Sequence, residues 1–163
     1  MSRADARAAY EALPIPDTTE EHWRFTDLRE FDPASFADGA GQTPDVSAPS
    51  MLELDVAAEA VVTESGIEIT RAPAEIRFEP LDESHDRLGS LVGWEEDKFA
   101  AHNAAAWQHG LLVHVPAGIE LERPLFVRVV NAVDGGSLFW RLLVVAEEGS
   151  RFSLVEEYSS LSP

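Results

Sequence analysis

Four apolar segments of similar length, separated by turn residues, fill the C-terminal third of the chain. They begin near residues 111, 125, 138 and 151 and read LLVHV, LFVRVV, LFWRLLVV and RFSLVEEY. The separators are Pro116-Ala117-Gly118, Asp134-Gly135-Gly136 and Glu148-Gly149. Apolar runs that recur every 13 to 14 residues or so predict the β-strands of a sandwich, a barrel or a solenoid. Four units do not distinguish between these architectures.

The last predicted strand runs almost to Pro163, so the β layer has no cap in the sequence. An open edge exposes unpaired backbone groups and apolar side chains. We therefore expect that the chain continues in nature, or that another subunit covers this end.

The first half of the chain predicts short helices and strands. Helix formers over residues 3–13 end at Pro14, and Thr18 with Glu21 has the spacing of a capping box before a short helix in the segment up to Phe31. Pro and Gly over residues 32–50 predict a linker. Further along, the sequence predicts strands over 59–63, 67–70 and 75–78, a short helix over 82–92 and an alanine-rich helix over 95–108.

These elements suggest three consecutive segments. Residues 1–49 form an N-terminal helical region with its linker, 50–110 a mixed strand and helix segment, and 111–163 the start of a β core. The fold class is therefore α+β.

Acidic residues outnumber basic ones along the whole chain. The sequence has 30 Asp and Glu against 12 Lys and Arg, a net charge of −18, and Lys98 is its single lysine. Such a surface suits a cytoplasm of molar salt, where the Debye length falls to about 3 Å and self-repulsion is screened. We infer a halophilic source; the alternative is an acidic protein that binds a basic partner. Nucleic acid is not an expected ligand, because phosphate binding needs clustered cations.

The chain contains no cysteine, which excludes disulfides, thiolate-held Fe–S clusters and cysteine zinc sites on these residues. No apolar run is long enough for a membrane span or a signal peptide, so we expect a cytoplasmic protein that does not contact membranes.

Histidine offers the best candidate for a metal site. His102 and His109 lie on or just after the predicted helix, and His114 follows in the first strand. Three imidazoles with a carboxylate could ligate a metal. His114 alternates with Val113 and Val115, however, and His102 lies among alanines, so surface and packing roles are favoured. We expect no metal, cofactor or catalytic residue on this chain: paired acids such as Glu147-Glu148 suit a solvated face, and no nucleophile elbow or phosphate loop is present.

One compact cluster is unusual for its composition. Trp23, Arg24, Phe25 and Thr26 combine two aromatic rings, a guanidinium and a hydroxyl in consecutive positions. Trp and Arg are the residues that most often dominate interfaces, so this is a candidate interaction motif. The alternative is that Trp23 and Phe25 pack the N-terminal helices onto the body of the protein.

Several segments, in order along the chain, resemble the SufB/SufD family of iron–sulfur cluster assembly proteins. The run Glu21-His-Trp-Arg-Phe-Thr-Asp-Leu28 is similar to the opening of SufD-like members. The run Asp97-Lys-Phe-Ala-Ala-His-Asn-Ala-Ala104 with the segments 110–118 and 122–125 resembles the family's entry into its β core. Glu147-Glu-Gly-Ser150 followed by 152–157 is similar to the end of an early coil.

The resemblance implies an N-terminal helical region with short strands that leads into the first coils of a right-handed parallel β-helix, here truncated. It also implies a non-catalytic subunit of the SUF scaffold complex, with a SufB-like paralogue and a SufC-like ABC-type ATPase as partners and the cluster handled by the full complex. The absence of cysteine fits SufD better than SufB. Two alternatives stay open: an acidic metal-dependent enzyme of cupin type, and a free-standing interaction domain.

Overall fold

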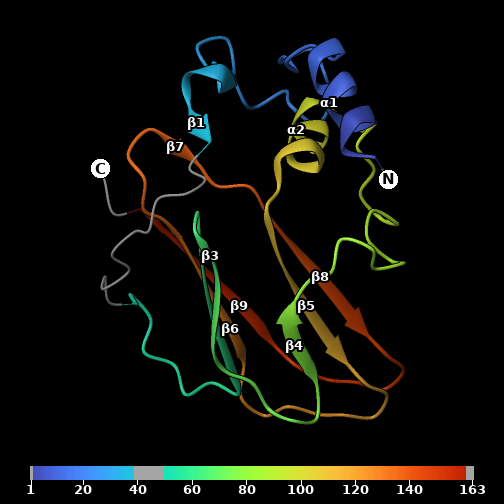
Figure 1. Ribbon diagram of the computed structural model, residues 1–163, viewed down its shortest axis with the longest axis vertical. Helices are drawn as coiled ribbons and strands as arrows, with labels where there is room; N and C mark the ends of the chain where they lie inside the picture. The colour runs from blue at the N-terminus through green and yellow to red at the C-terminus, as the bar shows by residue number, and fades with distance from the viewer. Residues whose placement is uncertain (1, 39–49, 161–163) are drawn as a thin grey trace. The chain divides into compact units, whose positions relative to one another are not determined.

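The computed structural model describes residues 2–38 and 50–160, and the predicted linker over 32–50 lies largely outside them (Figure 1). The chain divides into two compact units. A helical unit comprises Met1–Phe36 and Ser84–Trp107, and a sheet unit comprises Ala37–Glu83 and Gln108–Pro163. Each unit therefore draws on two separate stretches of the chain.

Two capped helices form the helical unit. Helix α1 (Arg3–Ala12) begins after Ser2, whose hydroxyl accepts a hydrogen bond from the Ala4 amide at 3.2 Å. Helix α2 (Lys98–Ala106) begins after Asp97, whose carboxylate accepts from the Phe99 and Ala100 amides, each at 2.8 Å. These caps satisfy amide groups that have no partner within the helix. Both helices confirm the sequence prediction to within a few residues.

Alanines let the two helices approach each other closely. The buried cluster of this unit consists of Ala6 of α1 with Ala104 and Ala105 of α2, against which Trp94 packs. Small side chains at a helix contact allow a short interaxial distance. The alanine-rich composition of α2 thus serves packing as well as helix propensity.

Two predicted short helices do not form. Residues 18–25 are a series of turns, closed by hydrogen bonds such as Thr26 N to Trp23 O at 2.8 Å, and a 3₁₀ helix η1 (Pro33–Ser35) follows. The Asp27 carboxylate accepts from the Arg29 amide at 3.1 Å, and such local side-chain bonds compete with a helix. Residues 82–92 also form turns, with Gly89 at φ 77°.

The sheet unit contains two main sheets. In the first, the strand order is β3 (Gly66–Arg71), β2 (Ala58–Thr63), β6 (Leu125–Asn131) and β9 (Leu154–Ser160). In the second, the order is β4 (Arg77–Pro80), β5 (His109–Val115) and β8 (Trp140–Ala146). A small parallel pair joins β1 (Ala37–Asp38) to β7 (Gly136–Ser137). The strands predicted from the sequence are confirmed, with boundaries shifted by a few residues.

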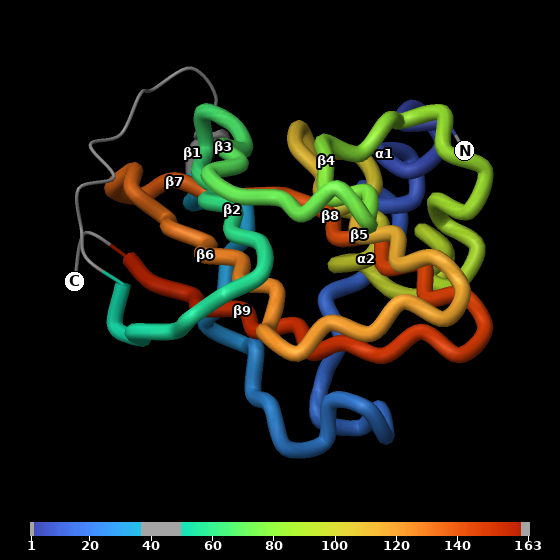
Figure 2. Tube along the Cα trace, turned by 90° about the horizontal axis from the view of Figure 1, so that it is seen from below, coloured from blue at the N-terminus to red at the C-terminus, as the bar shows by residue number. Residues whose placement is uncertain are grey.

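Consecutive strands of the predicted series enter opposite sheets, and each pairs in parallel with the strand after next. Leu111 of β5 faces Leu142 of β8, and Leu125 of β6 faces Leu154 of β9, so the structure repeats about every 30 residues. Figures 1 and 2 show β5 with β8 and β6 with β9 running side by side. The spacing of about 13 to 14 residues in the sequence is therefore half of the structural repeat.

The turns that connect the two sheets stack on one another. Gly118 and Gly149 have φ values of 71° and 73°, a conformation that favours glycine, and the Gly118 amide donates to the Glu148 carbonyl at 3.0 Å. A bridge between Glu120 and Arg151 continues the stack. The two glycine turns therefore hold successive repeats in the same register.

Inward side chains of both sheets make the core of this unit. Leu111, Val113 and Val115 of β5 meet Leu125, Val127 and Val129 of β6, and all are 4% exposed or less. The side chains one repeat later are more exposed, and Val144 reaches 40%. The first pair of strands is therefore the best-packed layer.

Candidate interaction site

The predicted interaction motif lies in the turns between α1 and η1, and its members point in different directions. The Trp23 ring lies 5.1 Å from the ring of Phe99 on α2. Phe99 also contacts Phe31 at 6.0 Å, and Phe31 contacts Phe36 at 6.0 Å. Tilted aromatic pairs at such distances are favourable. Trp23 therefore belongs to an aromatic cluster that packs the turns onto α2.

Arg24 and Phe25 are instead displayed to solvent. Phe25 is 86% exposed, and the Arg24 guanidinium lies 4.5 Å from the centroid of its ring. Arg24 also pairs with Glu21 at 2.9 Å, three residues earlier. Thr26 is exposed as well. An exposed phenylalanine beneath a guanidinium offers an apolar contact with a charged rim, which is the chemistry of an interface hot spot.

An ion pair lies immediately after the motif. The Arg29 Nε donates to Asp27 Oδ1 at 2.9 Å and to Oδ2 at 3.1 Å. Hydrogen bonds from the Arg29 side chain, and next from its backbone amide, lower the pKa of Asp27 from 3.8 to about 2. Asp27 is therefore ionised throughout the physiological range.

A hollow of ≈ 400 Å³ adjoins this pair in the same unit. Its lining combines apolar side chains with Asp27 and Arg29, and includes Ile15, Pro16, Leu28 and Phe31. Binding sites of this mixed kind join an apolar floor to a few polar groups. The hollow and the exposed Phe25 make the turn region the most suitable surface of the helical unit for a partner.

The three histidines of the candidate metal site have separate partners. His102 stacks on Tyr10 at 4.0 Å between ring centroids, and His109 Nε2 lies 3.2 Å from the Glu64 carbonyl oxygen. His114 Nε2 lies 2.7 Å from Glu147 Oε1. Among residues 2–38 and 50–160, no group of three or more His, Cys, Asp or Glu side chains is arranged to hold a metal ion. The described part of the chain thus offers the cupin-type alternative no ligand set.

Sequence reasoning missed three carboxylates that bind backbone amides. Glu64 is 3% exposed and accepts from the amides of Ala132 at 3.0 Å and Val133 at 3.2 Å. Glu147 accepts from Ala117 at 3.1 Å, and Glu157 accepts from Met51 and Leu52 at 3.0 and 3.1 Å. Paired acids were interpreted as a solvated face, and only the position of Glu64 before the Ser65-Gly66 turn signals a different role.

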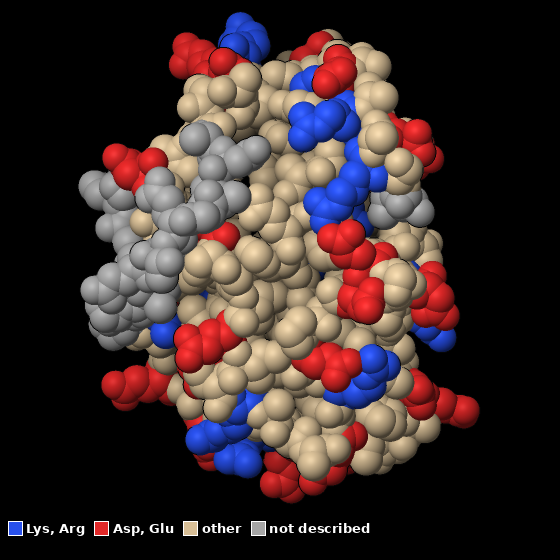
Figure 3. Space-filling view, in the orientation of Figure 1, with Lys and Arg blue, Asp and Glu red and all other residues tan. Residues whose placement is uncertain are grey.

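The charged groups are dispersed rather than gathered into one basic patch. Figure 3 shows acidic and basic side chains interspersed over the face in view. No helix in the described ranges has the length and apolar character that crossing a membrane requires.

Comparison with known proteins finds similarity to one group. The chain is 37% identical over 71 residues to an iron–sulfur cluster assembly SufBD family protein of Staphylococcus haemolyticus. It is 39% identical, also over 71 residues, to a SufBD family protein of Staphylococcus aureus strain USA300. The match covers 42% of this chain but only 15% of either relative. No protein-family model matches the chain.

These matches support the resemblance to the SufBD family over part of the chain. Staphylococcus epidermidis has a further relative with the same name and 37% identity. The matched segment is a small fraction of proteins that are several times longer.

Proposed function

We propose that this chain is part of a SufBD-family protein and acts in iron–sulfur cluster assembly as a non-catalytic segment of the scaffold. The observation that carries the proposal is the 37–39% identity over 71 residues to proteins named for that process. An enzymatic role has less support, because the described residues offer neither a metal ligand set nor a nucleophile with its base.

The strand pairing supports a further proposal about the fold. Two strands per repeat, one in each sheet, with parallel pairing about 30 residues apart, suit the first coils of a β-helix. We propose a right-handed parallel β-helix that continues beyond these residues in the full-length protein. The stacked glycine turns would then mark a corner that recurs in each coil.

We assign the chain to the SufD-like branch rather than the SufB-like branch. It has no cysteine, so no thiolate on these residues can ligate iron. The cluster is the product of the whole complex, and this segment would contribute folding and assembly. Its partners would be a SufB-like paralogue and a SufC-like ABC-type ATPase, in the cytoplasm.

The Arg24–Phe25 pair is the part of the motif that we propose for partner contact. Phe25 is 86% exposed, whereas Trp23 packs on α2. A contact here would belong to the helical unit.

Capture of the native protein from its own cells in molar KCl tests the proposal. Intact mass and co-purifying chains are measured together. An ABC-type ATPase and a paralogous subunit bound to a chain heavier than 17.9 kDa would support it. A 17.9 kDa chain with neither partner would refute the proposed role.

A tagged copy carrying Phe25→Ala tests the contact surface in the same experiment. Loss of a partner with the fold intact would locate the contact at the motif. Ile15→Ala, at the nearby hollow, is a comparison variant that leaves Phe25 in place.

A further inference from the structure

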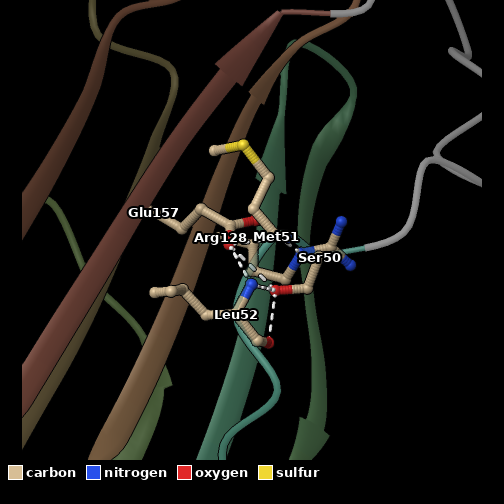
Figure 4. A network of polar contacts seen from close by, with 5 residues as sticks. All are labelled: Ser50, Met51, Leu52, Arg128 and Glu157. Atoms are coloured by element: carbon tan, nitrogen blue, oxygen red, sulfur yellow. Dashed lines mark hydrogen bonds and ion pairs between the residues drawn. The ribbon is translucent and has the colours of Figure 1, made fainter.

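A single buried carboxylate holds the segment that leads into β2. We call residues 50–56 the strap. Glu157 of β9 accepts from the Ser50 hydroxyl at 2.9 Å and from the Met51 and Leu52 amides at 3.0 and 3.1 Å, all at Oε2 (Figure 4). These partners lie more than 100 residues away in the sequence. Hydrogen bonds to an ionised acceptor are the strong class.

The carboxylate lies on the outer face of its sheet. Glu157 is in register with Arg128 of β6, and both alternate with inward residues such as Val129. The Glu157 side chain is 3% exposed, and its Oε1 lies 3.5 Å from Arg128 Nε. Phe126 and Val130 on this same face are 2% and 0% exposed, so the face is covered. The strap is fastened to it.

The two ends of the strap are held differently. Near β2, Val56 accepts from Arg71 at 2.8 Å, Asp55 pairs with Arg123 at 3.0 Å and the Ala57 amide donates to Pro124 at 2.9 Å. Beyond Asp55, toward Ser50, the hydrogen bonds that join the strap to the sheet go to Glu157. That end is thus attached chiefly through one side chain.

Apolar burial contributes little to holding this end. Met51 is 74% exposed, Leu52 41% and Leu54 40%, whereas Val56 at the other end is 6% exposed. Segments with few buried apolar contacts open at low free-energy cost. The position of residues 50–54 therefore depends on the Glu157 hydrogen bonds rather than on the core.

We propose that the strap is a conformational device locked by Glu157. Because Glu157 belongs to β9, the strap can close only when β9 is paired on β6. Closure of the strap and pairing of the last strand are therefore coupled, and each stabilises the other. Opening removes a cover from the outer face of β6.

Hydrogen exchange of the 163-residue chain tests the lock. Glu157→Gln keeps the shape but removes the charge, and Ser50→Ala removes one of the three donors. We expect Glu157→Gln to speed exchange of the Met51 and Leu52 amides on the order of tenfold, and Ser50→Ala to speed it less. Glu148→Gln, an exposed acid in the turn before β9, is the matched control and should change neither amide.

The coupling is tested in the same measurement. Ser50→Ala should also speed exchange of peptide 154–160, although Ser50 lies outside β9. Ser50→Ala should add less in the Glu157→Gln background than alone, because the two act through one contact. If strap exchange is unchanged in both single variants, or if peptide 154–160 does not respond to Ser50→Ala, the proposal is wrong. Ser50→Ala keeps the test decisive should Glu157→Gln fail to fold.

Discussion

Glu64 differs from most acids of this chain because its carboxylate replaces a backbone partner. Its oxygens accept from two amides at the end of β6, and the side chain is buried. The sequence places it among 30 acidic residues, and nothing in composition separates it from the exposed ones. Burial and partners decide the role of an acid, and both depend on a turn that is 68 residues away.

We expect Glu64→Ala to lower the free energy of unfolding by about 1–3 kcal/mol, because two amides lose their acceptor. Glu64→Gln should cost less, since one carbonyl oxygen remains. Urea unfolding followed by circular dichroism measures both. Glu68→Ala on β3, an exposed acid, should stay within about 0.5 kcal/mol of the wild type. Equal losses for Glu64→Ala and Glu68→Ala would contradict this account.

The Asp27–Arg29 pair predicts a titration. The pKa of Asp27 is about 2 when Arg29 is present, so Arg29→Gln should return it toward 3.8. A depressed pKa stabilises the folded state above the ordinary value, and the contribution is lost as pH falls toward about 2. Carboxyl NMR shifts across this range measure the change. Arg24→Gln, which removes the partner of Glu21, should leave Asp27 unaffected.

At the scale of elements, most of the secondary structure could be predicted because it follows local patterns. Helix α2 has alanines and an N-cap, and β5 and β6 are apolar runs between turn residues. The two failed helices, over 21–31 and 82–92, lack one apolar stripe and contain side chains or a glycine that favour turns. Which strand pairs with which could not be read from spacing, because alternate rather than adjacent strands meet.

The single lysine joins the two helices of its unit. Lys98 Nζ donates to the carbonyls of Tyr10 at 2.6 Å and Leu13 at 2.7 Å, at the C-terminal end of α1, and lies 4.4 Å from the Tyr10 ring centroid. Carbonyls at this end lack helical partners and attract cations. The structure thus gives a reason for lysine at this position in a chain whose other cations are arginines.

We expect Lys98→Met to lower the free energy of unfolding by about 1–3 kcal/mol, because two charge-assisted hydrogen bonds are lost. Lys98→Arg should recover only part, since a planar fork does not reproduce a compact ammonium group. Thermal unfolding of both variants measures the difference. Arg7→Met on α1 is a matched cation-to-apolar control, and a loss as large as that of Lys98→Met would contradict the specific role.

At the scale of the whole molecule, the net charge of −18 predicts a strong dependence of stability on salt. Like charges spread over a compact surface repel one another, and the Debye length of about 10 Å at 0.1 M falls to about 3 Å at 1 M. We propose a halophilic source on this basis and expect the melting temperature to rise by several degrees or more between 0.1 and 2 M KCl. Scanning fluorimetry measures it.

Two comparisons separate charge screening from a general exclusion effect. A neutral osmolyte at matched osmolality should raise the melting temperature less than KCl does, because it excludes itself from the surface without screening charge. A variant that replaces exposed acids with glutamine should melt higher in 0.1 M KCl and respond less to added salt; suitable positions are Glu53, Glu68, Glu83, Glu122 and Glu148. If wild type and variant respond equally to KCl, the acidic surface is not the cause, and the binding of a basic partner becomes the better explanation of the charge.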